Sequence, residues 1–382
     1  MGGAETWLIE MLKYWKLNNI GRFDFLITGG QSGIFDEEAK NLGSNLFYVE
    51  YSRSSLFKFI KEFRKLLMKG KYNAIHDHND YTCGWHFLWG TGLLPRVRVA
   101  HVHNPWMNIE VNYNVNIVRK FTSKLGKKFT RIYATDICGT SKEVLLSYDF
   151  MISPGGKPRV SVLHCGINVQ RFNNPVIHEK DRTSVLKEFN WTTDNHIVLF
   201  AGRLDQALEF KHPQNHKNSW LALHIIKTAM KLDSKLCFIM AGAGVEQQKK
   251  LQEVVESWGL STSIKLVGIR HDLDRLMRAS ALLLFPSAQE GLGMVAVEAQ
   301  ASGLPVLASD KVPKECKVVD SLFHTMELDD TVELWSNKLV EILRRPKPSL
   351  EFCGKMVNRS PFSIEHSSEL ALRIYRGDGF FE

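Results

Sequence analysis

The chain has 382 residues, of which 44% are hydrophobic and 24% are charged, and this composition excludes disordered and fibrous proteins. Such a length predicts two domains, and no stretch approaches the roughly 18 to 20 apolar residues that cross a bilayer. The formal net charge is +8, and the whole excess of basic residues falls in residues 1–159, which contain 22 Lys and Arg residues and 14 Asp and Glu residues.

The first part of the chain alternates short apolar runs with longer helical patterns, which predicts parallel βαβ units. One apolar face recurs at helical spacing from Leu56 to Leu67, and its other side is rich in lysine. A helix packed on a core is favoured there over an amphipathic membrane helix. A second basic helix is expected from Arg119 to Arg131. The expected strands are 23–26, 74–76, 97–101, 132–134 and 160–162.

A polar stretch without strong periodicity, from Asn168 to Asn195, predicts the domain boundary. The alternation then restarts, so a second doubly wound α/β domain is expected, with its ligand beyond the carboxyl ends of the strands. The expected strands are 197–200, 236–240, 264–267, 281–285 and 305–308, and the expected helices are 220–231, 247–257, 272–279 and 294–301.

Two glutamates follow the strand that ends at Phe285. Glu290 lies in a glycine-bearing turn, and Glu298 lies eight residues further on, inside the helix that opens near Met294. Both carboxylates can accept hydrogen bonds from hydroxyls on the same side of a ligand, and the helix start attracts phosphate or sugar oxygens. For an isolated pair, ordinary acidic residues near a helix start would explain the pattern equally well.

This segment resembles the Glu-x7-Glu signature of the retaining glycosyltransferases of family four. The family has the GT-B fold, two Rossmann-like domains that face a central cleft, with a final helix that crosses back to the first domain. Within the family, the chain looks most like the branch that builds bacterial capsular and exported polysaccharides. Further matches follow in order across nearly the whole chain: Gly2-Gly3, His101-Val102-His103-Asn104, Gly166-Ile167-Asn168, Ala201-Gly202-Arg203-Leu204, Lys217-Asn218, Val267-Gly268 and Ala301-Ser302-Gly303-Leu304-Pro305-Val306.

The resemblance implies a role for each matching residue. Glu290 would hold hydroxyls of the donor sugar, and Glu298 the ribose hydroxyls. Arg203 and Lys217 would neutralise the diphosphate, and fixed cations of this kind stabilise the departing nucleotide without a metal ion. Lys211 is an alternative candidate for the phosphate-binding lysine, but the sequence after Lys217 fits the family pattern better. The remaining expected donor-binding residues are Gly2, Gly3, Arg270, Gly291, Leu292, Gly293 and Met294.

His103 follows the strand expected at 97–101, so its side chain is expected near the carboxyl edge of the first sheet. The matching family histidine lies beside the donor sugar and the acceptor. In a retaining front-face displacement the donor phosphate can take the acceptor proton, so an orienting role suits His103 better than that of an obligate base. His76 and His78 are weaker candidates for the acceptor side.

The expected domains are 1–170, an acceptor-binding domain, and 171–361, a nucleotide-sugar-binding domain, followed by the crossover helix at 362–382. In the family a strand precedes the Gly-Gly turn, whereas here Met1 stands where that strand should end. Either the chain starts too late or the first sheet lacks its central strand, and unpaired neighbours would then cost solubility.

The sequence therefore predicts a retaining glycosyltransferase with a UDP-sugar donor, a saccharide or lipid-linked acceptor and no cofactor or metal ion. A nucleotide-sugar epimerase and a degenerate sugar-nucleotide-binding protein are the alternatives. The basic first part suggests contact with an anionic membrane, although a solvated basic face also explains it. No motif indicates nucleic-acid binding. Six scattered cysteines and no leader after Met1 predict a cytoplasmic protein, either free in the cytoplasm or peripheral at the inner face of the membrane.

Overall fold

A computed structural model describes residues 3–107, 117–153, 155–205 and 207–378. The chain divides into two compact units. The first comprises 1–167 together with 364–382, and the second comprises 168–363. The polar stretch after residue 168 is largely helical rather than irregular, because it contains α8 and α9.

The first unit contains two parallel sheets rather than one. Among the described residues, strands β1 and β2 pair only with each other, and β3, β4, β5 and β6 form a second sheet in that order. The elements are α1 (Gly3–Leu17), β1 (Phe25–Ile27), α2 (Asp36–Asn41), β2 (Leu46–Tyr48), α3 (Leu56–Gly70), β3 (Ala74–Asp77), α4 (Cys83–Gly90), β4 (Val97–Val102), α6 (Ile117–Tyr133), β5 (Asp136–Gly139), α7 (Lys142–Ser147), β6 (Arg159–Val162) and α16 (Ile364–Arg376).

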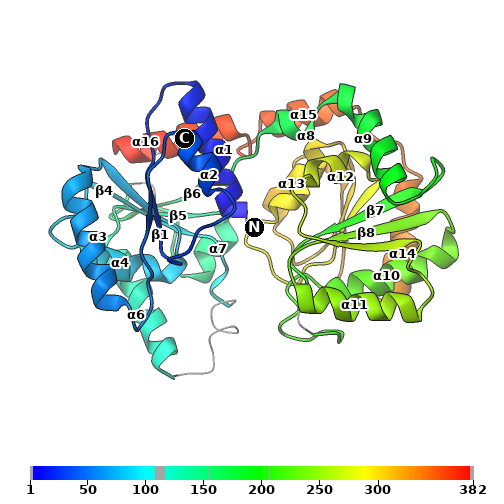
Figure 1. The fold of residues 1–382 in the computed structure, drawn as a ribbon, viewed down its shortest axis with the longest axis horizontal. Coiled ribbons are helices and arrows are strands. Elements are labelled where there is room, and N and C mark those ends of the chain that lie inside the picture. Colours follow the sequence, from blue (N-terminus) through cyan, green and yellow to red (C-terminus); the bar gives the residue numbers. More distant parts are fainter. Residues whose placement is uncertain (1–2, 108–116, 154, 206, 379–382) are drawn as a thin grey trace. The chain divides into compact units, whose positions relative to one another are not determined.

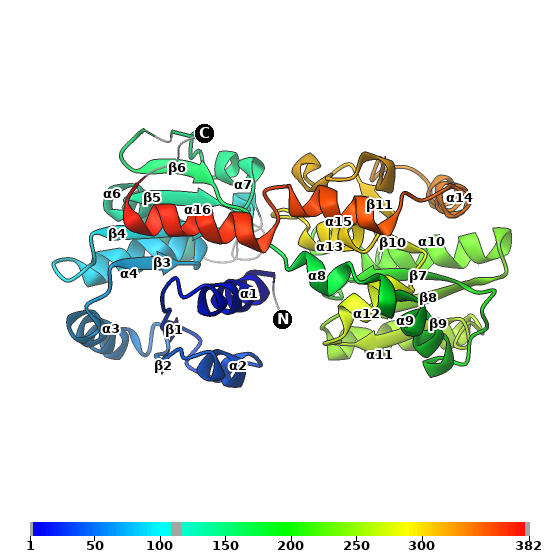
Figure 2. The same cartoon turned by 90° about the horizontal axis from the view of Figure 1, so that it is seen from above.

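The four-stranded sheet buries different residues on its two faces. Ala100 and Val102 of β4 pack with Phe87 of α4 in an apolar core. Helices α1 and α16 lie on the opposite face (Figure 2). Since side chains alternate along a strand, the histidines of β3 and β4 project toward α1 and α16.

Helix α3 has the core-packed face that its periodicity predicts, because Phe59, Phe63 and Leu67 are buried. The predicted strand at 132–134 is wrong. Ile132 and Tyr133 belong to the last turn of α6, and the strand follows at β5. Helix α6 buries small residues and exposes Ile132, so the apolar residues there do not mark a buried strand.

The second unit is a doubly wound domain with a six-stranded parallel sheet in the order β9-β8-β7-β10-β11-β12. Helices α10, α11 and α14 cover one face, and α8, α9, α12, α13 and α15 cover the other (Figure 1). The elements are α8 (Val169–Phe172), α9 (Pro175–Glu188), β7 (His196–Ala201), α10 (Ser219–Leu232), β8 (Leu236–Ala241), α11 (Val245–Ser257), β9 (Ile264–Gly268), α12 (Leu273–Ala279), β10 (Leu282–Phe285), α13 (Met294–Ala301), β11 (Val306–Ser309), β12 (Phe323–Met326), α14 (Val332–Leu343) and α15 (Leu350–Asn358).

The central strands of this sheet are buried except for His196 at the start of β7, and β7, β8, β10 and β11 are apolar except for His196 and Ser309 at their ends. A parallel sheet covered on both faces requires this pattern. Within the described ranges no helix is both long enough and apolar enough to cross a membrane. All six cysteines are described and buried, and none of them forms a disulfide.

Candidate functional site

The strand order of the second unit reverses between β7 and β10. Ligands of open parallel sheets bind beyond the carboxyl ends of the strands at such a point. Strand β7 ends at Ala201 and leads into Arg203, whereas β10 ends at Phe285 and leads into the segment that carries Glu290. The topology therefore brings together two of the regions in which the sequence predicts donor-binding residues.

Hydrogen bonds join the segment before α10 to the segment after β10. The Asn218 side-chain amide donates to the carbonyl of Pro286 at 2.8 Å, and the Ala288 amide donates to the carbonyl of His216 at 2.8 Å. As a result, the Lys217 ammonium donates to a carboxylate oxygen of Glu290. Only 24% of the Lys217 side chain and 8% of the Glu290 side chain are exposed.

Asp205 fixes the backbone on the other side of Lys217. One of its carboxylate oxygens accepts from the Lys217 amide at 3.0 Å, and the other accepts from the Ser219 amide at 2.9 Å. The carboxylate is buried, so removing it would leave two donors without a partner. Lys211 instead pairs with Asp329 at 2.7 Å on the surface, and the structure thereby favours Lys217 over its rival.

The glycine turn before α13 depends on Gly293, which precedes the helix with a φ of +89°. A side chain is strained in this left-handed region, and a Cβ would also lie 3.1 Å from the Phe285 ring. Leu292 is buried and anchors the turn, whereas Gly291 and Met294 are partly exposed. The first turn of α13 thus presents its backbone beside the segment that carries Glu290.

Glu298 lies inside α13 with its carboxyl group in a desolvated position. Burial raises the pKa of this carboxyl to about 7, while Arg171 opposes the rise and Asp274 adds to it. Within the described part of the chain, no hydrogen bond to the carboxylate oxygens of Glu298 is found. A ligand with paired hydroxyls would supply the missing donors.

The two arginines predicted to bind the donor have different surroundings. Arg203 is exposed just beyond β7. Arg270 contacts Asp272 and Glu188, each at 2.7 Å. Those carboxylates raise the pKa of Arg270, so its guanidinium links the end of α9 to the start of α12. These contacts favour a structural role for Arg270.

In the first unit, His103 directly follows β4 as the sequence predicts. Its backbone amide donates to the carboxylate of Asp80 at 2.7 Å, and its Nε2 lies 3.0 Å from Nδ1 of His78. Burial, with a contribution from His78, lowers the pKa of His103 well below its usual range. Gly3 is exposed at the start of α1, and Gly2 lies outside the described residues.

Residues 181–358 match the family model described as "Glycosyl transferases group 1". This part of the chain belongs to that glycosyltransferase family. The resemblance inferred from the sequence is thus confirmed for this part of the second unit, where Lys217, Glu290 and Glu298 lie.

Relatives of this glycosyltransferase extend over both units. EpsF of Bacillus subtilis (strain 168), itself only provisionally assigned as a glycosyltransferase, is 24% identical over 98% of this chain and 93% of its own length. The capsular polysaccharide biosynthesis glycosyltransferase CapH of Staphylococcus aureus is 24% identical over 91% of this chain and 88% of its own.

The fold of the glycosyltransferase is also found among solved structures. HepE of Anabaena, crystallised with UDP, superposes with a TM-score of 0.74 at 17% identity, over 98% of this chain and 96% of HepE. This likeness confirms the expected GT-B class of α/β fold.

Two parts of the glycosyltransferase are not anticipated by sequence reasoning. Asp80 and Asp205 each hold the backbone of a predicted site residue, yet neither has a distinguishing local pattern. The grouping of His76 and His78 with His101 and His103 could have been found, because a His-x-His pair places both rings on one face of a strand. Strands β3 and β4 are adjacent, so the two pairs meet.

Proposed function

We propose that this glycosyltransferase moves a sugar from a nucleotide diphosphate to a saccharide or lipid-linked saccharide, with retention of configuration, in polysaccharide or glycoconjugate synthesis. The contact between Lys217 and Glu290 carries the proposal. In this contact an ammonium and a carboxylate lie together after the strand-order reversal of the second unit's sheet, where ligands of open parallel sheets bind. In the proposal the ammonium binds the diphosphate and the carboxylate accepts from sugar hydroxyls. The polysaccharide role is supported by the likeness to CapH.

UDP-sugar is the proposed donor, supported by the complex of HepE with UDP. Glu298 would accept both ribose hydroxyls, because its buried carboxyl has no other donor in the described residues. Glu290 would accept from hydroxyls of the sugar. The backbone at residues 291–294 would bind the sugar and the distal phosphate at the start of α13.

The proposed transfer breaks the bond between the anomeric carbon and the diphosphate oxygen and forms a bond to the acceptor oxygen on the same face. The acceptor proton passes to the departing phosphate. Lys217 and Arg203 would stabilise the charge that develops on the diphosphate, so the donor site requires no divalent cation. His103 would orient the acceptor, with its backbone held by Asp80.

Membrane contact is part of the same proposal, because α6 has an unusual distribution of side chains. Its buried face consists of Ser123, Gly126 and Thr130. Ile117 is 84% exposed and Phe121 is 64% exposed. The helix has several exposed lysines and no acidic residue. Exposed apolar side chains among lysines are typical of helices that lie on anionic bilayers, where a lipid-linked acceptor would be found.

Vesicle sedimentation tests this contact. Wild type should bind vesicles containing phosphatidylglycerol and release them at high salt, and Phe121→Ser combined with Ile117→Ser should weaken binding several-fold. The matched control is Phe57→Ser, since Phe57 is also exposed but lies on α3. Equal binding by all three proteins would remove α6 from the proposal.

Nucleotide-sugar binding, followed by turnover, tests the donor chemistry. Thermal shifts with UDP-, GDP- and ADP-sugars in chelator should show one selective donor, as ligand linkage requires. Free nucleotide should then be released only when an acceptor is present. Interconversion of the sugar without release would indicate an epimerase, and binding without turnover a degenerate binding protein. No shift with any nucleotide sugar would contradict the proposal.

A further inference from the structure

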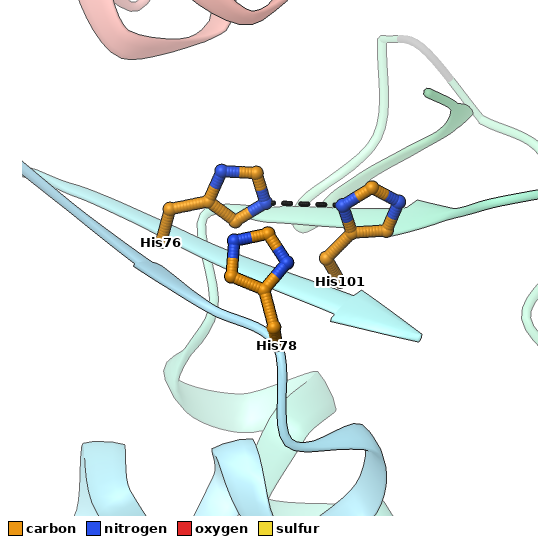
Figure 3. Close-up of side chains that lie close together, drawn as sticks. All are labelled: His76, His78 and His101. Atoms are coloured by element: carbon orange, nitrogen blue, oxygen red, sulfur yellow. Dashed lines mark hydrogen bonds between the residues drawn. The ribbon is translucent and has the colours of Figure 1, made fainter. Parts of the chain in front are cut away.

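Three histidines in the first unit direct ring nitrogens toward a common point. His76 lies on β3, His78 just after it, and His101 on β4, and their candidate ligand nitrogens all lie within 4.8 Å of one another. Figure 3 shows the rings of His76 and His101 facing each other with His78 beside them. We propose that these three imidazoles bind one Zn²⁺ ion at a site within the first unit.

The backbone explains why the rings converge. His76 and His78 are two residues apart, and residues of this spacing project from the same face of a strand. In the parallel ladder His76 lies opposite Val99, so His101 belongs to the same face. Trp7 of α1 closes that face with edge-to-ring contacts to all three imidazoles. The convergence therefore follows from rigid elements rather than from a loop.

The spacing of the nitrogens suits a tetrahedral metal ion. Nε2 of His76 lies 3.2 Å from Nδ1 of His101. Two imidazoles on one Zn²⁺, each with a Zn–N distance of about 2.0–2.1 Å, hold their nitrogens about 3.3 Å apart. One edge of the coordination tetrahedron is thus already present, and the candidate nitrogen of His78 lies within 4.8 Å of the other two.

Hydrogen bonds to the outer nitrogens of His76 and His78 support the same assignment. Metal-binding imidazoles normally donate their second N–H to a fixed acceptor. Nδ1 of His76 lies 2.5 Å from the Tyr375 hydroxyl, which leaves Nε2 for the metal. If His78 binds through Nε2, its Nδ1–H can donate to Nε2 of His103 at 3.0 Å. The site would then join α16 to β3 through Tyr375.

The chemistry of the three ligands indicates which class of metal ion the site would bind. Three neutral nitrogen ligands select a late first-row ion such as Zn²⁺ rather than Mg²⁺. Partial exposure of His76 and His78 leaves a route of entry.

The test uses the full chain produced without a histidine tag and stripped with chelator. Calorimetric titration should show that the chain binds about one equivalent of Zn²⁺ and does not bind Mg²⁺. In a thermal melt, Zn²⁺ should raise the Tm by roughly 5 °C at a free concentration 100-fold above Kd. His101→Asn and His78→Gln should each weaken Zn²⁺ binding at least tenfold. His271→Asn is the matched control, because His271 is exposed in the second unit and should leave binding unchanged.

X-ray absorption on the Zn²⁺ complex of the wild type identifies the ligands of the ion without any variant. It therefore tests the site even if the variants misfold. Three imidazole nitrogens at about 2.0 Å would support the site. Absence of Zn²⁺ binding by the wild type, fewer than three imidazoles, or binding that survives both substitutions would overturn it. None of these measurements involves a nucleotide sugar, so the result is independent of the proposed transfer reaction.

Discussion

Lys217 and Glu290 are in contact although 73 positions separate them in the chain. The contact depends on two neighbouring segments that exchange backbone and side-chain hydrogen bonds, among them the bond from Asn218 to Pro286. In the absence of donor, the carboxylate neutralises the ammonium. In the proposed donor complex, the diphosphate would give the ammonium a second anion, and Glu290 would then accept from sugar hydroxyls.

Lys217→Ala should therefore lower turnover by about 10²- to 10³-fold, the usual effect of removing one group that stabilises transition-state charge. Lys211→Ala is the matched control, because Lys211 pairs with Asp329 on the surface and should leave kcat/KM unchanged. Nucleotide release under saturating acceptor measures both. A larger loss in the Lys211 variant would exchange the roles of the two lysines.

Asn218 combines a left-handed backbone, with a φ of 52°, and a buried hydrogen bond. Asn218→Gly should retain the backbone but leave the Pro286 carbonyl without a donor, which costs about 1–3 kcal/mol of unfolding free energy. Asn218→Ala should lose about 1–2 kcal/mol more through backbone strain. Urea denaturation measures the two steps, and equal stability of the Gly and Ala variants would show that the backbone conformation is not under strain.

Glu298 should make stability depend on pH. Burial raises the pKa of its carboxyl from 4.5 to about 7, so the folded state binds more protons than the unfolded state between these values. The stabilisation is fully present below pH 4.5 and is lost as pH rises to about 7, a change of at most about 3 kcal/mol. Glu298→Gln should remove this dependence and be more stable than wild type at pH 8 without ligand.

The same variant should bind the donor more weakly, because a neutral amide accepts ribose hydroxyls less well than a carboxylate. Donor affinity of the wild type should accordingly rise as pH increases through about 7. Parallel denaturation and donor titrations from pH 5 to 8 test both statements. Stronger donor binding by the Gln variant at pH 8 would contradict the ribose assignment.

The second sheet could be predicted from the sequence because its central strands are buried on both faces. Leu282 to Phe285 reads as one apolar run, and such runs mark covered parallel strands. Strands β2 and β12 lie at sheet edges, where partial exposure removes that pattern. In α6 the pattern is reversed, since the helix exposes Phe121 and buries Gly126, and this reversal explains the incorrect strand at 132–134.

The candidate site was predictable only in part for a related reason. Glu290 and Glu298 lie within one segment, so their spacing is visible in the sequence. The contact of Lys217 with Glu290 and the support given by Asp205 arise from tertiary hydrogen bonds between distant segments. The proximity of His76 and His101 was partly predictable. It follows from the alternation of side chains along a strand once β3 and β4 are known to be neighbours.

The close packing of α6 on α4 leads to a final prediction, which concerns Gly126. A Cβ on Gly126 would lie 2.4 Å from the carbonyl oxygen of Tyr81 and 3.0 Å from the Trp85 ring. Neither neighbour can move freely, since backbone and a packed indole form that wall. Gly126→Ala should therefore cost about 1–3 kcal/mol of unfolding free energy through overpacking.

Gly29→Ala is the matched control in the same unit, because a Cβ there meets nothing within 4 Å. Its unfolding free energy should stay within about 0.5 kcal/mol of wild type, as for most surface changes. If α6 is instead a loosely attached helix, Gly126→Ala would be as stable as the control. In that case α6 could adjust its position on α4, and its outward apolar residues would not be fixed for contact with a bilayer.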